Sequence, residues 1–223
     1  MNLKECAQEV HQLLLEKYGD PSWRDPLPIL DQLIQTILSQ NTNDNNSDRA
    51  FEKLKKTFGS WEDVRDADEI SVIEAIRSAG LANQKGGRIQ KILRQITAER
   101  GSLELEFLRE LPDDEAMGWL LKFNGVGPKT ASIVLLFSLG KPAFPVDTHI
   151  QRVSGRIGLR PEKMSNEQAH HHLAELFPPE TYKPAHLNII RLGREVCHPR
   201  LPACGICVLQ SLCDFYHKSQ IGL

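Results

Sequence analysis

Lys129 stands where a glycine turn meets an apolar helix, a place where an amine can act as a nucleophile. It follows residues 123–128, which read Phe-Asn-Gly-Val-Gly-Pro, and it precedes a mostly apolar stretch over 130–137. A proline suits the first position of a helix. The positive end of the helix dipole disfavours a charged ammonium there, and a neutral lysine can form a Schiff base. The alternative is a surface lysine that contacts phosphate.

Asp147 is the carboxylate that the chain can bring back to this lysine. The expected helix over 128–139 rises roughly 18 Å at about 1.5 Å per residue. Residues 140–146 can span roughly 23 Å when extended, so they can return Asp147 to the side of Lys129. Asp147 also precedes the next expected helix, over 148–155, where capping is its ordinary role. The two roles are compatible, because a capping carboxylate is held rigidly.

Gly125 and Gly127 lie in the turn between two expected helices. Glycine permits backbone angles that other residues resist. Backbone N–H groups at a helix N-terminus bind phosphate without reading the base sequence. The pattern predicts a helix-hairpin-helix whose turn, with Val126 between the glycines, binds the DNA backbone. The alternative is an ordinary connection between helices.

Four cysteines have the spacing of metal ligands. Cys197, Cys204, Cys207 and Cys213 follow the pattern Cys-x6-Cys-x2-Cys-x5-Cys. Four thiolates suit either zinc or a [4Fe–4S] cluster. Zinc sites usually contain two closely spaced pairs, whereas only the central pair is close here, which favours the cluster. Arg200 lies inside this loop, as a candidate phosphate contact or a solvated charge.

Composition is ordinary for a soluble globular protein, with 40% hydrophobic and 25% charged residues among 223. The net charge of −2 does not identify a nucleic-acid binder, but residues 77–100 contain six Lys and Arg against one Glu. Such a stretch meets phosphate or forms a solvated helix face.

The location that the sequence predicts is cytoplasmic, with no membrane partner. No apolar run reaches the ~18 residues of a membrane span, and residues 1–10 do not follow the pattern of a signal peptide. A reducing setting fits cysteines that hold a metal rather than disulfides. We expect a monomer.

Apolar residues recur at helical spacing nearly throughout the chain, and strand patterns are almost absent. We expect an all-α protein of about ten short helices, the last over 182–197. Ser165 and Gln168 form a predicted capping box. No domain boundary can be read from composition.

The glycine turn with its lysine, the Val-Asp-Thr-His segment at 146–149 and the cysteine pattern together resemble the endonuclease III family of helix-hairpin-helix DNA glycosylases. The resemblance implies two helical domains that flank a DNA-binding cleft. One is a six-helix barrel over 22–133 that includes the hairpin, and the other is a discontinuous cluster domain over 1–21 and 134–223. Lys129 and Asp147 would be catalytic, and the four cysteines would hold a [4Fe–4S] cluster.

Two further segments resemble the family less closely. Residues 38–44, Leu-Ser-Gln-Asn-Thr-Asn-Asp, align with Leu-Ser-Ala-Gln-Ala-Thr-Asp, whose glutamine fills the gap left by a flipped base. Either Gln40 or Asn41 is therefore expected to fill it. Residues 80–85 resemble the family's Gly-Leu-Tyr segment, which makes Leu81 the wedge in the base stack. Lys85 is a further expected DNA contact, and the alanine that replaces the tyrosine leaves the lesion preference open.

The resemblance implies a base-excision-repair DNA glycosylase with lyase activity at abasic sites, acting on double-stranded DNA that contains damaged bases or abasic sites. Lys129 would attack the sugar of an oxidised pyrimidine, and β-elimination would cut the strand 3′ to the lesion. One alternative is a monofunctional glycosylase for adenine, thymine or uracil in mispairs, in which Asp147 activates water and Lys129 has no role. The other is a non-catalytic iron–sulfur DNA-binding protein, which leaves the pairing of Lys129 and Asp147 unexplained.

Overall fold

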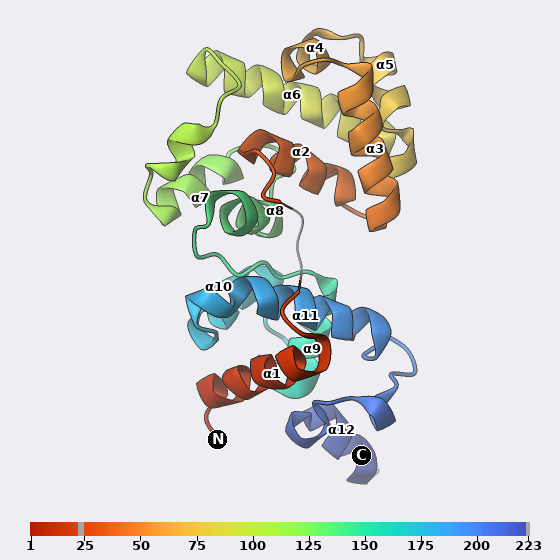
Figure 1. Ribbon diagram of the computed structural model, residues 1–223, viewed down its shortest axis with the longest axis vertical. Coiled ribbons are helices and arrows are strands. Elements are labelled where there is room, and N and C mark those ends of the chain that lie inside the picture. The colour runs from red at the N-terminus through yellow and green to blue at the C-terminus, as the bar shows by residue number, and fades with distance from the viewer. Residues whose placement is uncertain (22–24, 222–223) are drawn as a thin grey trace. The chain divides into compact units, whose positions relative to one another are not determined.

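The computed structural model describes residues 1–21 and 25–221, and the regular elements of this part are all helices, which confirms the all-α prediction (Figure 1). The chain divides into two compact units. Unit 1 combines Met1–Asp25 with Gly140–Leu223, and unit 2 is Pro26–Leu139. The domain limits expected from the sequence, 22–133 with 1–21 and 134–223, stay a prediction.

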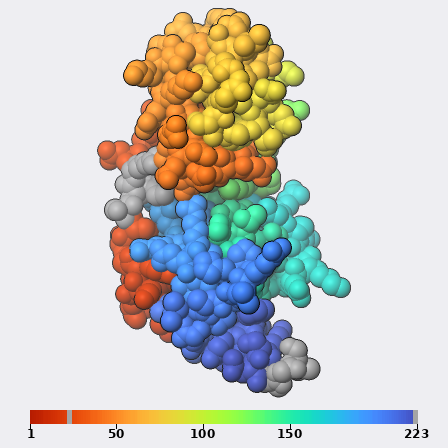
Figure 2. All heavy atoms as spheres, turned by 90° about the vertical axis from the view of Figure 1, so that its right-hand side faces the viewer, coloured from red at the N-terminus to blue at the C-terminus, as the bar shows by residue number. Residues whose placement is uncertain are grey.

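Unit 2 is built around α2, which is flanked by α3, α6 and α8 (Figure 1). Four apolar side chains of α2, Leu33, Ile34, Ile37 and Leu38, are completely buried, because they project on adjacent turns toward these neighbours. The helices of the unit are α2 (Ile29–Ser39), α3 (Asp44–Thr57), α4 (Trp61–Asp66), α5 (Glu69–Ala75), α6 (Ala82–Arg100), α7 (Asp113–Leu121) and α8 (Pro128–Val134). The segment around α3 and α5 covers one side of the unit (Figure 2).

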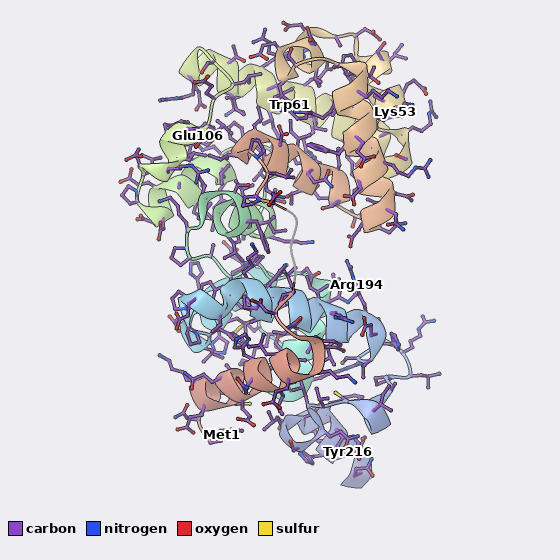
Figure 3. The ribbon with its side chains drawn as sticks, viewed as in Figure 1. Met1, Lys53, Trp61, Glu106, Arg194 and Tyr216 are labelled. Atoms are coloured by element: carbon purple, nitrogen blue, oxygen red, sulfur yellow. The ribbon has the colours of Figure 1, made fainter. Side chains whose placement is uncertain are left out.

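Asp31 joins three of these helices through polar contacts. Its carboxylate accepts a 2.7 Å hydrogen bond from the indole Nε1 of Trp61, at the start of α4 (Figure 3), and forms a 3.1 Å salt bridge with Lys55 of α3. Lys55 also lies over the Trp61 ring. A nearly buried carboxylate is tolerated here because both of its partners are donors.

Unit 1 packs α11 (Tyr182–Glu195) against α1 (Leu3–Tyr18) and α9 (Thr148–Ile157), and α10 (Asn166–Leu176) also contacts α1. The predicted capping box of Ser165 and Gln168 begins α10 and is confirmed. The helix expected over 182–197 is present as α11, but the expectation that it is the last helix is wrong, because α12 (Asp214–Ile221) follows the final cysteine. That segment was missed because its eight residues carry little apolar periodicity. Within the described residues, none of the helices combines the length and apolarity that crossing a membrane requires.

Candidate functional site

The predicted helix-hairpin-helix is present in unit 2, where a short turn joins α7 to α8. Gly125 adopts a φ of 84°, a left-handed conformation that favours glycine. The buried Val126 fixes the turn from inside, and its N–H donates a 3.0 Å hydrogen bond to the Phe123 carbonyl. The Phe123 ring in turn packs edge-on against Trp119 of α7. Gly127, which precedes α8, is exposed.

Lys129 is the second residue of α8 and is half-buried. Pro128 occupies the first helical position, as predicted. Among the described side chains none caps this helix, so the N–H groups of its first turn are left for an external acceptor. The amine therefore lies beside a backbone turn of the kind that binds phosphate.

Gln40 is not free to reach into DNA, because both ends of its amide are bound to the protein. Its Nε2 donates to the Gly125 carbonyl at 3.1 Å and to the Thr130 hydroxyl at 3.2 Å. Its Oε1 accepts a 2.9 Å hydrogen bond from Arg88. Asn41, by contrast, is exposed and left-handed, with a φ of 54°. The sequence did not single out Arg88, because its contact with Gln40 joins residues 48 positions apart.

Leu81 begins α6 as an exposed leucine in a left-handed conformation, with a φ of 49°. A left-handed conformation costs about 1–2 kcal/mol for a residue other than glycine. An apolar side chain that is both strained and half exposed is unusual unless it has a use on the surface. The observation is consistent with a wedge, a role that stays a prediction.

Lys85, which the sequence led us to expect at the DNA surface, is instead a buried residue of unit 2. Its side chain is 2% exposed, and its ammonium donates to the Leu38 and Ala79 carbonyls at 2.7 and 2.8 Å. Burial, and then the charge of Arg88, lowers the pKa of Lys85 to about 8. The ammonium is therefore enclosed between the end of α2 and the helical turn that precedes α6, and it is used within the protein.

The basic stretch over 77–100 does not form one uniform patch. Arg77 pairs with Glu74. Arg94 donates to the Arg65 carbonyl at 3.0 Å, and Arg100 lies over the Phe107 ring. These side chains are used within unit 2, so net charge along the sequence overstates the surface available to phosphate.

Asp147 belongs to unit 1 and caps α9, as predicted. Its Oδ1 accepts a 2.8 Å hydrogen bond from the Ile150 N–H, and the side chain is half-buried. Nearby, burial lowers the pKa of His149, an effect that the Asp147 charge opposes. Lys129 lies in unit 2, so the predicted proximity of the two catalytic candidates stays a prediction.

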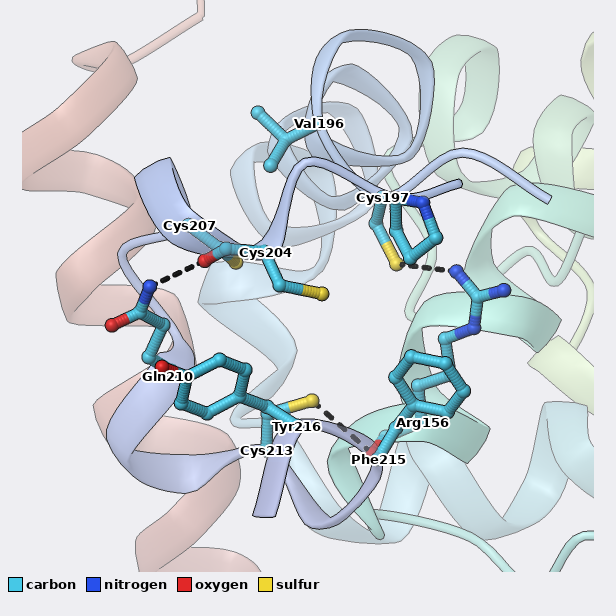
Figure 4. Close-up of a pocket in the computed structure, with 10 residues that line it drawn as sticks. Arg156, Val196, Cys197, Cys204, Cys207, Gln210, Cys213, Phe215 and Tyr216 are labelled. Carbon is cyan, nitrogen blue, oxygen red and sulfur yellow. Dashed lines mark hydrogen bonds between the residues drawn. The ribbon is translucent and has the colours of Figure 1, made fainter. Parts of the chain in front are cut away.

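Four sulfur atoms surround one pocket of unit 1 (Figure 4). Cys197 follows α11, Cys204 and Cys207 flank a short turn, and Cys213 precedes α12. The pocket contains about 300 Å³ of space not filled by atoms, part of it open to solvent. Its remaining lining includes the rings of Phe215 and Tyr216. The sulfurs approach this space from several sides, as the ligands of a multi-atom group do (Figure 4).

The chemistry of this donor set fits a cationic group. All four thiols are free of disulfides, and burial raises the pKa of Cys207 and Cys213, with a further increase from the neighbouring sulfurs. Without a positive charge nearby these two thiols favour their protonated form, and a bound metal would favour the thiolate form. In the described part of the chain no group of three or more His, Cys, Asp or Glu is arranged to hold a single metal ion.

Arg156 supports the cysteine loop, and the sequence analysis missed it. Its Nη1 approaches the Cys197 sulfur at 3.3 Å and donates to the His198 carbonyl at 2.7 Å. The guanidinium also lies over the Phe215 ring. No local pattern could have indicated this role, because the contacts join residues more than 40 positions apart. Arg200, the predicted phosphate contact in the loop, is exposed.

Comparison with known proteins identifies relatives along nearly the whole chain. A family model described as HhH-GPD superfamily base excision DNA repair protein matches residues 34–179. Endonuclease III of Thermotoga maritima is 34% identical over 220 residues, which cover 99% of this chain and 96% of that protein. A relative from Arabidopsis thaliana is 44% identical over 152 residues, 68% of this chain, and the chain spans about half of its length, 52%.

Solved structures agree with this result. A trapped covalent intermediate of endonuclease III with DNA superposes with a TM-score of 0.84 at 28% identity. The match covers 99% of this chain and 100% of that one.

Proposed function

Because this chain belongs to the endonuclease III family within the HhH-GPD superfamily of base excision DNA repair proteins, we propose that it is a bifunctional DNA glycosylase and abasic-site lyase. The observation that carries the proposal is the position of Lys129, a half-buried amine in the first turn of α8, directly after the exposed hairpin turn. The partner of the protein is double-stranded DNA with a damaged base or an abasic site.

The amine of Lys129 acts as the nucleophile. Its lone pair attacks C1′ of the deoxyribose while the glycosidic bond breaks, and the base leaves with the electron pair. Loss of protons from nitrogen and opening of the sugar ring give a Schiff base. This makes the C2′ proton acidic, and its removal expels the 3′ phosphate, so the strand is cut. Asp147 stabilises the positive charge on the sugar and assists deprotonation of the amine.

The substrate class is an oxidised pyrimidine that is flipped out of the duplex. Asn41 fills the gap that the base leaves, since the Gln40 amide is already bound to Gly125 and Thr130. Leu81 inserts into the base stack. The hairpin turn binds the DNA backbone, and the exposed Arg200 adds a phosphate contact.

The four cysteines hold a [4Fe–4S] cluster, supported by their arrangement around one pocket. When bound, the cluster links three segments of unit 1 and supplies the positive charge that buried thiolates require. It takes no part in the reaction of Lys129. A cysteine site of this kind is maintained in a reducing, intracellular setting.

Trapping with borohydride tests this function, because the reductant converts a Schiff base into a stable covalent adduct. The purified protein should be incubated with duplexes that contain thymine glycol, dihydrouracil, uracil, an abasic site or a mispaired adenine. We expect adducts and incision with the oxidised pyrimidines and the abasic site, and no adduct with Lys129→Gln. An adduct with Lys129→Gln would assign the nucleophile elsewhere.

The same panel separates the two other candidates. A monofunctional mismatch glycosylase would release the mispaired base without forming an adduct. A non-catalytic DNA-binding protein would leave every duplex intact.

A further inference from the structure

Arg88 lies directly over the hairpin turn. A Cβ atom added to Gly125 would collide with the Nε, Cδ and Cζ atoms of the Arg88 side chain. Gly125 therefore lacks a side chain for two reasons, its left-handed backbone and the closeness of this guanidinium. The arginine belongs to α6 and the glycine to the turn before α8, so the contact joins two parts of unit 2.

Gln40 holds the guanidinium in this place. Its Oε1 accepts from Arg88 Nη1, while its Nε2 donates to the Gly125 carbonyl and the Thr130 hydroxyl. One amide thus connects the arginine, the turn and the start of α8. In the family pattern discussed above, alanine stands at the position of Gln40, and alanine could form none of these bonds.

The charge of Arg88 remains available to an external anion. Within residues 1–21 and 25–221, Gln40 is its hydrogen-bond acceptor, and no carboxylate forms a salt bridge with it. Its side chain is partly exposed. A guanidinium has five N–H donors in a fixed plane, so one bond to an amide leaves the others free for phosphate oxygens.

We propose that Arg88 is a phosphate-binding residue of the hairpin, and that Gln40 is the positioning residue that holds it over Gly125. The inference rests on the proposed function, since it takes the hairpin as the DNA-backbone site. Arg88 adds a full charge to a turn that otherwise offers backbone N–H groups. Gln40, through Thr130, also ties this contact to the turn of helix that carries Lys129.

The dependence of binding on salt tests the role of Arg88. The probe is a duplex with a tetrahydrofuran abasic analogue, which cannot form a Schiff base. Its Kd is measured by fluorescence anisotropy for wild type, Arg88→Gln and Arg88→Lys at several KCl concentrations. Loss of one phosphate contact makes the slope of log K against log salt shallower by about 0.9. The ratio of the Kd of Arg88→Gln to the Kd of wild type should therefore fall roughly 3.5-fold between about 50 and 200 mM KCl. Arg88→Lys keeps the charge and should keep the slope.

Arg94→Gln is the matched control, because it removes the same charge from the same helix at a residue that is bound to the Arg65 carbonyl. It should leave the slope unchanged. Denaturant unfolding of each variant confirms that it is folded. If Arg88→Gln weakens binding but retains the wild-type slope, Arg88 stabilises the turn without binding phosphate, and the inference is overturned.

Gln40→Ala tests the positioning role. If Gln40 acts through Arg88, the effect of Arg88→Gln on Kd should be smaller in the Gln40→Ala background than in wild type. If the effects of Gln40→Ala and Arg88→Gln on the free energy of binding simply add, the positioning role of Gln40 is overturned. Wild type that does not bind the duplex at all would refute the proposed function together with this inference, whereas steep salt dependence that survives Arg88→Gln refutes the inference alone.

Discussion

The ammonium of Lys85 donates a 2.7 Å hydrogen bond to the carbonyl of Leu38, a residue 47 positions earlier in the chain. A second bond, to the Ala79 carbonyl, extends from the same nitrogen. Leu38 lies just before Asn41, and Ala79 lies just before Leu81. The buried amine therefore connects the end of α2, which leads to Asn41, with the helical turn that leads to Leu81, the residues that we assign to the gap and the wedge.

Lys85→Met should destabilise unit 2. The substitution leaves the Leu38 and Ala79 carbonyls without their donor, and a buried unsatisfied polar group costs about 1–3 kcal/mol. Denaturant unfolding should show the loss. Lys91→Met, an exposed change on the same helix, should leave the free energy of unfolding nearly unchanged. Equal stability of the two variants would show that the buried contacts contribute nothing.

The contribution of Lys85 should also depend on pH. Its pKa is about 8 when folded, against 10.5 for an unburied lysine. Between these values the unfolded state binds more protons, so stability rises as the pH increases through this window. The difference in unfolding free energy between wild type and Lys85→Met should therefore be larger at about pH 10 than at about pH 7. A difference that does not change with pH would contradict the assignment.

Local patterns in the sequence were sufficient for elements that depend on neighbouring residues. The capping by Asp147, the capping box of Ser165 and the proline at the start of α8 were predicted because each involves residues within three or four positions. The same reasoning failed for Lys85, which looked like one of a row of surface bases. Its burial depends on the Ala79 carbonyl, six positions away, and on the Leu38 carbonyl at the end of α2, 47 positions away.

The choice between Gln40 and Asn41 shows the same limit. Both are short amides at adjacent positions, and the sequence could not separate them. In the structure Gln40 bonds with Gly125 and Arg88, contacts that depend on how α2 packs in unit 2, and on this ground we propose Asn41 for the gap. Composition and spacing identify which residues are present, but long-range packing decides which of them remain available.

Leu81→Gly should separate stability from activity. Glycine adopts the left-handed conformation without the cost of about 1–2 kcal/mol, although its greater flexibility offsets part of that gain. The free energy of unfolding should therefore be unchanged or higher by up to about 1 kcal/mol. Single-turnover incision of a thymine glycol duplex should fall about tenfold, because the wedge is missing. Leu81→Ala should lose the same activity without the increase in the free energy of unfolding. Full activity of Leu81→Gly would exclude a wedge.

Asp147→Asn should distinguish capping from catalysis. Asparagine caps helices as well as aspartate does, so the stability of α9 should be retained. Loss of the charge should lower the rate of base removal by about 10²–10⁴-fold. Asp147→Ala should in addition lower the free energy of unfolding by about 0.5–2 kcal/mol. If Asp147→Asn removes bases at the wild-type rate, the carboxylate is a cap alone.

The cysteine pocket should hold iron and sulfide rather than zinc. Protein purified without oxygen should be brown, with a broad visible absorption band from charge transfer between thiolate and iron. Cys204→Ser should lose this band together with the bound iron, and α12 should lose protection from hydrogen exchange, since Cys213 tethers its start. Cys6→Ser is the control, because Cys6 lies on α1 and does not line the pocket. A colourless protein with one bound zinc would refute the cluster and leave the roles of Lys129 and Asp147 unaffected, since the reaction that we propose takes place on their side chains.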